Sequence, residues 1–177
     1  MSTLSVLFDQ YSSDKNREHS YGQFYDDLFS SLKTSVKNFL EIGVLHGASL
    51  FAWQDFFPYA QITGLDHWSD AVSGPRITTV KADSQKSDEV HNAFIKSSVV
   101  TPFCISVDDG GHWIENQLAT FHVMKKYIKK GGLYIIEDIQ NIFEATPVFV
   151  PLGFEMVDRR HIKGRGDDVL AVYRNEE

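Results

Sequence analysis

Apolar residues in this chain gather in short runs that are separated by glycine, proline and charged residues. Five of these runs have the length and composition of buried strands, and each ends at or beside a carboxylate: 38–42, 61–66, 77–83, 103–107 and 133–136. The segments between them carry apolar residues at helical spacing, most clearly at 48–57, 87–96 and 113–130. Strands that alternate with helices predict a mostly parallel sheet.

The end of the sequence follows a different pattern, because two strand-like runs, 154–161 and 169–174, flank the glycine-rich segment 163–166. Such a pair predicts an antiparallel hairpin. The whole pattern therefore predicts a Rossmann-like α/β domain with a mostly parallel seven-stranded sheet, an antiparallel C-terminal hairpin and helices on both faces. We expect residues 1–36 to form a helical N-terminal segment and residues 37–177 to form the ligand-binding domain.

The overall composition limits the choice of partners. A chain of 177 residues is most simply a single domain with a substantial core. Its formal charge of −7 and pI of about 5.4 argue against nucleic acid as a partner, because nucleic acid binds to basic surfaces. One cysteine, no charged-then-apolar leader and no apolar run of about 20 residues predict a cytoplasmic protein without a membrane span. A small molecule is the expected partner, and a homo-oligomer stays possible.

The segment 39–49 joins the first predicted strand to a helix through Gly43 and Gly47. Glycine lets backbone N–H groups approach a ligand closely, although a strand–turn–helix connection needs glycine even without a ligand. The spacing lacks the third glycine of dinucleotide sites, and Glu41 at the strand end suits a cationic ligand better than a pyrophosphate. S-adenosylmethionine (SAM), with its sulfonium and ammonium groups, meets this requirement better than NAD. Ser49 stands at the start of the following helix.

Acidic residues follow several of the predicted strands, and parallel strands bring their carboxyl ends to one rim of a sheet. Asp66 lies where an acid can accept hydrogen bonds from ribose hydroxyls, and Asp83 could reach the adenine side. Either acid alone is equally well explained as a helix cap or a turn residue. The acidic pairs at 108–109 and 137–138 are harder to explain in this way, because neighbouring like charges destabilise a fold. Three or four carboxylate oxygens with water suit Mg²⁺ or another hard divalent cation.

His112 follows Asp109 by three residues, across a pair of glycines. Imidazole is the side chain best able to accept a proton near neutral pH. We therefore assign His112 as the general base, and the remaining histidines are weaker candidates.

A polar cluster near the N-terminus contains Lys15, His19 and Tyr21, in a stretch with little apolar periodicity. The ordinary explanation is a solvated loop before an amphipathic helix. The alternative is a lid that folds over the methionine end of the cofactor and over the acceptor. We expect the lid, because so polar a cluster has no evident structural role in the sequence.

Four motifs together resemble one family. They are Tyr11-x-x-Asp14-Lys15 with His19-x-Tyr21 and Tyr25, Leu40-Glu41-Ile42-Gly43-Val44 with Gly47 and Ser49, Asp108-Asp109-Gly110-x-His112, and Gly131-Gly132-x-Tyr134-x-x-Glu137-Asp138. With these motifs the chain resembles the class I, metal-dependent SAM O-methyltransferases of the macrolide-sugar (mycinamicin-type) and cephalosporin-hydroxylase-related group. The resemblance extends from about residue 9 to about residue 174.

The resemblance implies a SAM-binding methyltransferase domain, with the metal held by Asp109, Glu137 and Asp138 and with His112 as the base. It also implies that SAM, and SAH as its product, lie at the glycine turn. Together with the arguments above, we expect these residues to bind the cofactor: Lys15, Tyr21, Glu41, Gly43, Val44, Gly47, Ser49, Asp66, Asp83 and Asp108.

The expected activity is transfer of the SAM methyl group to a hydroxyl of a sugar, a polyol or a phenolic compound. Gly111 stands where the family usually has a serine, so the motif does not identify the acceptor. Two other functions fit the same residues: a SAM-binding module without turnover, and an NAD(P)-dependent oxidoreductase. Calorimetry with SAM against NAD⁺ separates the oxidoreductase from the other two, and a methyl-release assay separates the enzyme from the module.

Overall fold

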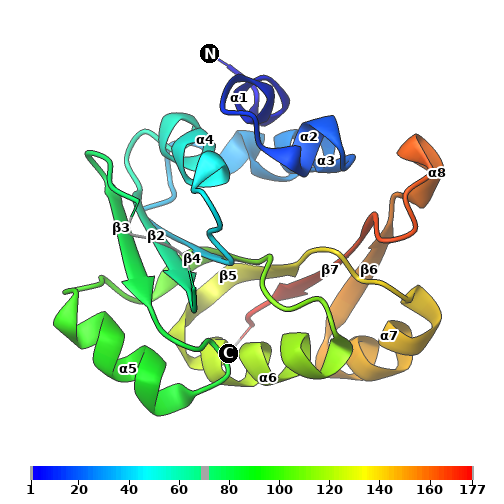
Figure 1. The fold of residues 1–177 in the computed structure, drawn as a ribbon. Coiled ribbons are helices and arrows are strands. Elements are labelled where there is room, and N and C mark those ends of the chain that lie inside the picture. Colours follow the sequence, from blue (N-terminus) through cyan, green and yellow to red (C-terminus); the bar gives the residue numbers. More distant parts are fainter. Residues whose placement is uncertain (1, 69–71, 177) are drawn as a thin grey trace.

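A single seven-stranded sheet organises the chain in the computed structural model, which describes residues 2–68 and 72–176 (Figure 1). The strands are β1 Asn38–Ile42, β2 Gln61–Asp66, β3 Ile77–Lys81, β4 Phe103–Asp108, β5 Ile128–Ile136, β6 Phe154–Asp158 and β7 Val169–Arg174. They lie in the order β3-β2-β1-β4-β5-β7-β6. Neighbours from β3 to β5 are parallel, whereas β7 is antiparallel to both β5 and β6. The predicted fold class is confirmed.

Helices cover both faces of the sheet, as expected (Figure 1). One face carries α1 Leu4–Gln10, α2 Asp14–Arg17, α3 Tyr21–Phe29 and α4 Ala48–Phe56. The other face carries α5 Ser87–Lys96, α6 Ile114–Met124 and α7 Ile142–Phe149, and α8 Arg160–Lys163 lies between β6 and β7. Three short 3₁₀ turns follow α3, α6 and α7, at Ser30–Leu32, Lys125–Tyr127 and Val150–Leu152. Within the described ranges, none of the helices has the length and apolarity to cross a bilayer.

The core between the sheet and the first four helices is centred on Trp53, which is fully buried. The ring centroids of Phe8, Tyr25 and Phe39 lie 4.9, 5.2 and 4.8 Å from that of Trp53. These neighbours come from α1, α3 and β1, so one side chain joins three segments of the chain. The indole Nε1 donates a hydrogen bond to Glu41 Oε1 at 3.1 Å, which satisfies its polar group inside the core.

The N-terminal helices are part of this core. Leu4 and Phe8 of α1 are fully buried, in the same apolar cluster as Trp53. Because the N-terminal segment 1–36 shares its core with α4 and the sheet, its removal would expose apolar surface on both. The expected boundary between 1–36 and 37–177 stays a prediction.

The helix expected at 113–130 is shorter, and this expectation was wrong at its C-terminal end. The α-helix ends at Met124, and β5 begins at Ile128, before the glycine pair 131–132. The glycines form an irregularity within the strand instead of ending a helix. Gly131 has a φ of +75°, and the register of β5 against β4 shifts at this point.

The strand expected at 154–161 ends earlier, at Asp158. The Asp158 carboxylate accepts a hydrogen bond from the backbone N–H of Arg160 at 3.1 Å, and the next residues form α8. A local turn therefore competes successfully with continuation of the strand. Similarly, β3 ends at Lys81, two residues earlier than expected.

The structure predicts that Trp53→Ala lowers the free energy of unfolding by about 3 to 5 kcal/mol. The substitution creates a cavity among three segments and leaves Glu41 without one of its hydrogen-bond donors. Urea denaturation at pH 7 measures the effect. Trp68→Ala is the matched control, because this indole is 82% exposed and its loss should change the free energy by no more than about 0.5 kcal/mol. Equal losses in the two variants would contradict this account of the core.

Candidate active site

The carboxyl ends of the parallel strands form one rim of the sheet, and three of the expected side chains meet there. Asp109 follows β4, Asp138 follows β5, and His112 lies in the loop that leads to α6. His112 Nε2 lies 3.7 Å from Asp109 Oδ1 and 3.7 Å from Asp138 Oδ2. One ligand atom from each residue lies within 4.8 Å of the other two, close enough to hold one metal ion. The nearby Asp109 carboxylate and the other negative charges raise the pKa of His112, although partial burial opposes them.

Lys15 brings a positive charge into the same rim, and its side chain is only 2% exposed. Its Nζ donates hydrogen bonds to Asp109 Oδ2 at 2.6 Å and to Glu137 Oε2, and it lies 3.5 Å from Glu41 Oε1. Ser13 starts α2 by accepting a hydrogen bond from the backbone N–H of Lys15. The N-terminal segment therefore places one ammonium group among three acids: Glu41 in β1, Asp109 after β4 and Glu137 after β5.

Three carboxylates around one buried ammonium group cannot all be charged without a large cost. Burial alone would lower the pKa of Lys15, but the three carboxylates outweigh it and raise this pKa well above its ordinary value. Burial alone would raise the pKa of Asp109, but Lys15 and His112 together outweigh it and keep this pKa below the usual value. Burial is the larger effect at Glu137 and Glu41, and it raises the pKa of both. Burial thus favours the protonated form of Glu137, although Lys15 opposes it.

Glu137 is oriented differently from the other two expected metal ligands. Its Oε1 accepts a hydrogen bond from the Tyr25 hydroxyl at 2.5 Å, and its Oε2 accepts one from Lys15. Two groups of potential metal ligands occur among the described residues, His19 with Asp167 and Asp168, and Asp109 with His112 and Asp138, and neither contains Glu137. Direct coordination by Glu137 therefore requires Lys15 or Tyr25 to move, and this role of Glu137 stays a prediction.

The turn after β1 depends on Gly43, which has a φ of +84°. A Cβ at this position would lie 2.0 Å from the backbone oxygen of Asp109, so a larger residue would displace the loop after β4. The backbone N–H groups of Val44 and Leu45 donate to Asp66 Oδ2 at 2.7 and 3.2 Å. The turn and the acid expected to bind SAM thus lie side by side. Their contact with a cofactor stays a prediction.

Glu41 and Ser49, both expected to bind the cofactor, face the interior. Glu41 is fully buried, with Oε2 accepting from the Ser49 hydroxyl at 2.7 Å and Oε1 accepting from Trp53 Nε1. Gly47 precedes α4 with a φ of +77°. Because both oxygens of Glu41 already have protein partners, the structure gives this residue a role inside the fold, and its contact with a cofactor stays a prediction.

Asp83 and Asp108 also have partners of their own. Asp83 accepts a hydrogen bond from the backbone N–H two residues further on, at 3.0 Å, and lies 3.5 Å from Lys86 Nζ, as a turn residue does. Asp108 is buried and accepts hydrogen bonds from the Tyr134 hydroxyl at 2.7 Å and from Gly110 N–H at 3.2 Å. Burial raises the pKa of Asp108 to about 7. The expected cofactor contacts of these two acids stay predictions.

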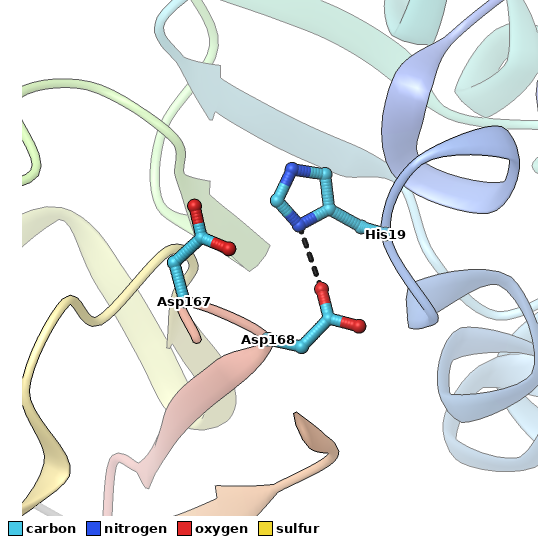
Figure 2. Close-up of side chains that lie close together, drawn as sticks. All are labelled: His19, Asp167 and Asp168. Atoms are coloured by element: carbon cyan, nitrogen blue, oxygen red, sulfur yellow. Dashed lines mark hydrogen bonds and ion pairs between the residues drawn. The ribbon is translucent and has the colours of Figure 1, made fainter. Parts of the chain in front are cut away.

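Two residues of the expected lid, His19 and Tyr21, are bound to the rim. His19 Nδ1 lies 2.8 Å from Asp168 Oδ1, and Figure 2 shows the imidazole facing this carboxylate. Asp168 also accepts from the backbone N–H of Ser20 at 3.1 Å. The Tyr21 hydroxyl donates to Asp138 Oδ1 at 2.7 Å. The segment is therefore attached both to the candidate active site and to the loop before β7.

Sequence reasoning assigned no role to the side chains that hold the predicted residues in place, although the motifs above contain Tyr25 and Tyr134. They are Tyr25 on Glu137, Trp53 on Glu41, Tyr134 on Asp108 and Asp168 on His19. Only Asp168 carries a usable signal: it directly precedes β7, and the amino end of an antiparallel strand lies at the same rim as the carboxyl ends of its parallel neighbours. The sequence does not show which acids the aromatic partners contact, because buried aromatic residues are common throughout this core.

No protein-family model matches the chain. Among curated proteins, it is 32% identical over 145 residues to the mycinamicin VI 2''-O-methyltransferase of Micromonospora griseorubida. It is equally similar to the demethylmacrocin O-methyltransferase of Streptomyces fradiae, again 32% over 145 residues. Each match covers 77% of this chain and 36% of the relative, so the chain spans about a third of the length of these proteins. The matches confirm the resemblance to the macrolide-sugar O-methyltransferases.

Solved structures agree with the fold. The MycE methyltransferase of the mycinamycin biosynthetic pathway, in complex with Mg, SAH and mycinamycin VI, matches with a TM-score of 0.80 and 24% identity. This match covers 98% of the chain and 55% of the MycE chain. An O-methyltransferase from Bacillus cereus in complex with SAH matches with a TM-score of 0.65 and 15% identity, over 99% and 91% of the two chains. Both likenesses support the Rossmann-like methyltransferase architecture.

The burial of Asp108 predicts a pH dependence of stability. Its folded pKa of about 7 lies above the usual value of 3.8, so the stability contributed by the protonated carboxyl is complete below about pH 4 and is lost as the pH rises to about 7. Asp108→Asn cannot ionise, and its amide can donate to Tyr134 while its oxygen accepts from Gly110. We expect the variant to gain stability relative to wild type, by up to about 4 kcal/mol, between pH 4 and pH 8.

Urea denaturation at a series of pH values measures this difference. Asp158→Asn is the control, because Asp158 lies at the surface beside Arg160 and its pKa is lowered to about 2. The stability difference between this control and wild type should stay constant between pH 4 and pH 8. A constant difference for Asp108→Asn as well would show that the buried carboxyl is not the titrating group.

Proposed function

We propose that this chain is a SAM-dependent O-methyltransferase that transfers the methyl group of SAM to a hydroxyl of a small molecule, with help from a divalent cation such as Mg²⁺. The observation that carries the proposal is the meeting of His112 with Asp109 and Asp138 at the rim, beside the Gly43 turn. Methylation of a hydroxyl requires a base, a means of stabilising the oxyanion and a methyl donor held in line. The rim combines candidate groups for all three requirements.

The names of the relatives support this proposal. Mycinamicin VI 2''-O-methyltransferase and demethylmacrocin O-methyltransferase are named for transfer of a methyl group to an oxygen. The MycE structure contains Mg and SAH together, and the Bacillus cereus enzyme contains SAH. A metal-assisted reaction that uses SAM is therefore consistent with what is bound in proteins of the same fold.

The cofactor would lie over the turn of Gly43 to Gly47, next to Asp66. Gly43 leaves no side chain between the turn and the loop of Asp109, and Asp66 is already drawn to the turn by the N–H groups of Val44 and Leu45. An acid at the end of the second strand suits the ribose hydroxyls of SAM. SAH would leave from the same place, since it keeps the same adenosine group.

The rim residues fit a hard divalent cation. Asp109 and Asp138 offer carboxylate oxygens within 4.8 Å of each other and of His112, and oxygen donors of this kind suit Mg²⁺. Lys15 compensates only one of the negative charges in this region. A bound divalent cation would supply Lewis acidity that lowers the pKa of the acceptor hydroxyl. Glu137 could join as a third carboxylate after Lys15 moves away from it.

His112 is the residue that would accept the proton of the acceptor hydroxyl. Its Nε2 faces the two carboxylates, and these negative charges stabilise the imidazolium that forms after proton transfer. The side chain is 42% exposed, so an acceptor can reach it from solvent. Asp109 and Asp138 thereby orient the base as well as offering oxygen ligands.

Removal of divalent ions should abolish methyl transfer and leave SAH binding nearly unchanged, because the cofactor contacts lie on the glycine turn. The measurements are methyl release before and after exhaustive EDTA treatment, and calorimetry with SAH and with NAD⁺. Asp109→Asn should behave like EDTA treatment, whereas Asp88→Asn, an exposed carboxylate in the first turn of α5, should behave like wild type. Full activity in protein proven free of metal, or tighter binding of NAD⁺ than of SAH, would overturn the proposal.

His112→Ala should lower kcat by about 10²- to 10⁴-fold, because the variant lacks the base. Binding of SAH and of Mn²⁺, measured by calorimetry and by electron paramagnetic resonance, should change little. His122→Ala is the control: this histidine is exposed in the last turn of α6, away from the acids of the rim. If His112→Ala instead loses Mn²⁺ binding, His112 is a metal ligand and the proton must leave by another route.

A further inference from the structure

A cavity of about 200 Å³ opens at the amino ends of β4 and β5, on the face of the sheet that carries α1 to α4. Its lining comes from the start of β4, the first half of β5, the last residue of β7 and the connection between the first 3₁₀ turn and β1. The acids of the candidate active site follow the other ends of β4 and β5. The length of these strands therefore separates the cavity from the place proposed for methyl transfer.

Part of the lining is apolar. Val36, Ile105 and Leu133 line the cavity, are no more than 2% exposed and belong to the core between the sheet and the first four helices. Leu32 and Cys104 also line it and pack against the same core. A ligand that enters the cavity meets this apolar surface, so an apolar part of the ligand favours binding.

Three cationic side chains line the same cavity: Lys129, Lys130 and Arg174. Arg174 lies opposite Leu133 in the pairing of β7 with β5, and residues paired in this way share one face of a sheet. None of the three cations is in an ion pair with a residue that the structure describes, and no acid lines the cavity. In a chain with a formal charge of −7, these cations lack an internal partner that a negatively charged ligand would supply.

An irregularity of β5 carries the two lysines. Between consecutive contacts of these strands, β4 advances two residues, from 103 to 105, whereas β5 advances five, from 128 to 133. Gly131, with its φ of +75°, lies inside this insertion. Successive residues of a regular strand point to opposite faces, but Lys129 and Lys130 both line one cavity. The insertion thus directs two neighbouring cations to the same place, as strand irregularities beside binding sites do.

Asn175 holds the insertion in place, and its side chain is buried. Its Nδ2 donates a hydrogen bond to the carbonyl of Ile128 at 2.9 Å. Its backbone N–H donates to the carbonyl of Gly132 at 2.9 Å, and its carbonyl accepts from the N–H of Gly131 at 2.6 Å. The backbone that presents the cations is therefore ordered by contacts within the protein, which lowers the entropy cost of binding a ligand there.

We propose that this cavity binds a small organic anion: a carboxylate attached to an apolar body about as large as one six-membered ring. The carboxylate would accept hydrogen bonds from Lys130 and Arg174 while the body covers the apolar lining. The volume sets the size, because drug-sized ligands occupy cavities of about 300 Å³ or more. Inorganic phosphate would leave the apolar lining uncovered, and a neutral molecule would leave the cations without a partner. This site is additional to the proposed methyltransferase function and does not depend on it.

Calorimetry with benzoate tests the proposal on the full chain, with acetate and benzamide as matched probes. Acetate has the charge without the ring, and benzamide has the ring without the charge. Benzoate should bind at least about tenfold more tightly than either, because it alone uses both parts of the cavity. Raising NaCl from about 20 to about 200 mM should weaken benzoate binding severalfold, because salt screens the exposed cations.

Arg174→Gln and Lys130→Gln should each weaken benzoate binding about fivefold and leave benzamide binding unchanged, because each variant removes one positive charge. Lys96→Gln is the matched control: this lysine is exposed in the last turn of α5 and does not line the cavity. All three substitutions replace exposed side chains, and urea denaturation checks that the variants are folded. Unchanged benzoate affinity in both cavity variants, or an equal loss in the control, would overturn the proposal.

Cys104 gives an independent readout, because it lines the cavity and is the only cysteine of the chain. Benzoate should slow alkylation of this thiol by iodoacetamide, with the same midpoint as in calorimetry, and Arg174→Gln should shift the midpoint about fivefold higher. SAH should not displace benzoate, since the place proposed for the cofactor lies at the other end of the strands. Displacement by SAH, alkylation that saturating benzoate does not slow, or benzoate binding no tighter than that of acetate would each show that the anion does not occupy this cavity.

Discussion

One buried ammonium group determines how the rim of this sheet is assembled. Lys15 contacts acids from β1 and from the segments after β4 and β5, and two of these, Glu41 and Glu137, are almost completely shielded from solvent. Removing a buried carboxylate from water costs several kcal/mol unless a cation and hydrogen bonds compensate it. The compensation comes from a short N-terminal helix that is far from these strands in sequence. The first residues of the chain are thus as much a part of the site as the strands themselves.

The topology of the sheet explains why the two halves of the proposed reaction meet at one place. From β1 the sheet continues to β2 and β3 on one side and to β4 and β5 on the other, so the rim is divided at the junction of β1 and β4. The turn after β1 and the loop after β4 touch: Asp109 N–H donates to the carbonyl of Ile42 at 2.8 Å, and Gly43 lies against the Asp109 backbone. In the proposed reaction, this contact would bring a methyl donor bound beside β1 within reach of a methyl acceptor bound beside β4.

The sequence was sufficient to predict the strands and the mostly parallel sheet, because its apolar runs have clear periods and clear ends. The sequence was less informative where the same residue type is common in two kinds of structure. Gly131 and Gly132 looked like a helix stop, but only the pairing of β5 with β4 shows that they lie within a strand. Spacing along the chain placed Asp109, His112 and Asp138 on one rim. It could not give the direction of the Glu137 side chain, because this depends on Tyr25, which lies 112 residues away.

The junction between the two ends of the chain has a consequence for biosynthesis. Lys163 Nζ donates to the carbonyl of His19 at 2.8 Å, Arg159 Nε donates to the carbonyl of Ser20 at 2.8 Å, and Asp168 lies 149 residues from its partner His19. These contacts can form only after residues 159–168 have been synthesised, and closing so long a loop is slow compared with forming local helices. The segment that carries Lys15 therefore depends on long-range contacts with residues 159–168 to be held against the sheet. Lys15 and Glu137 are 122 residues apart, so the pairing of the buried charges also depends on a long-range contact of the kind that slows folding.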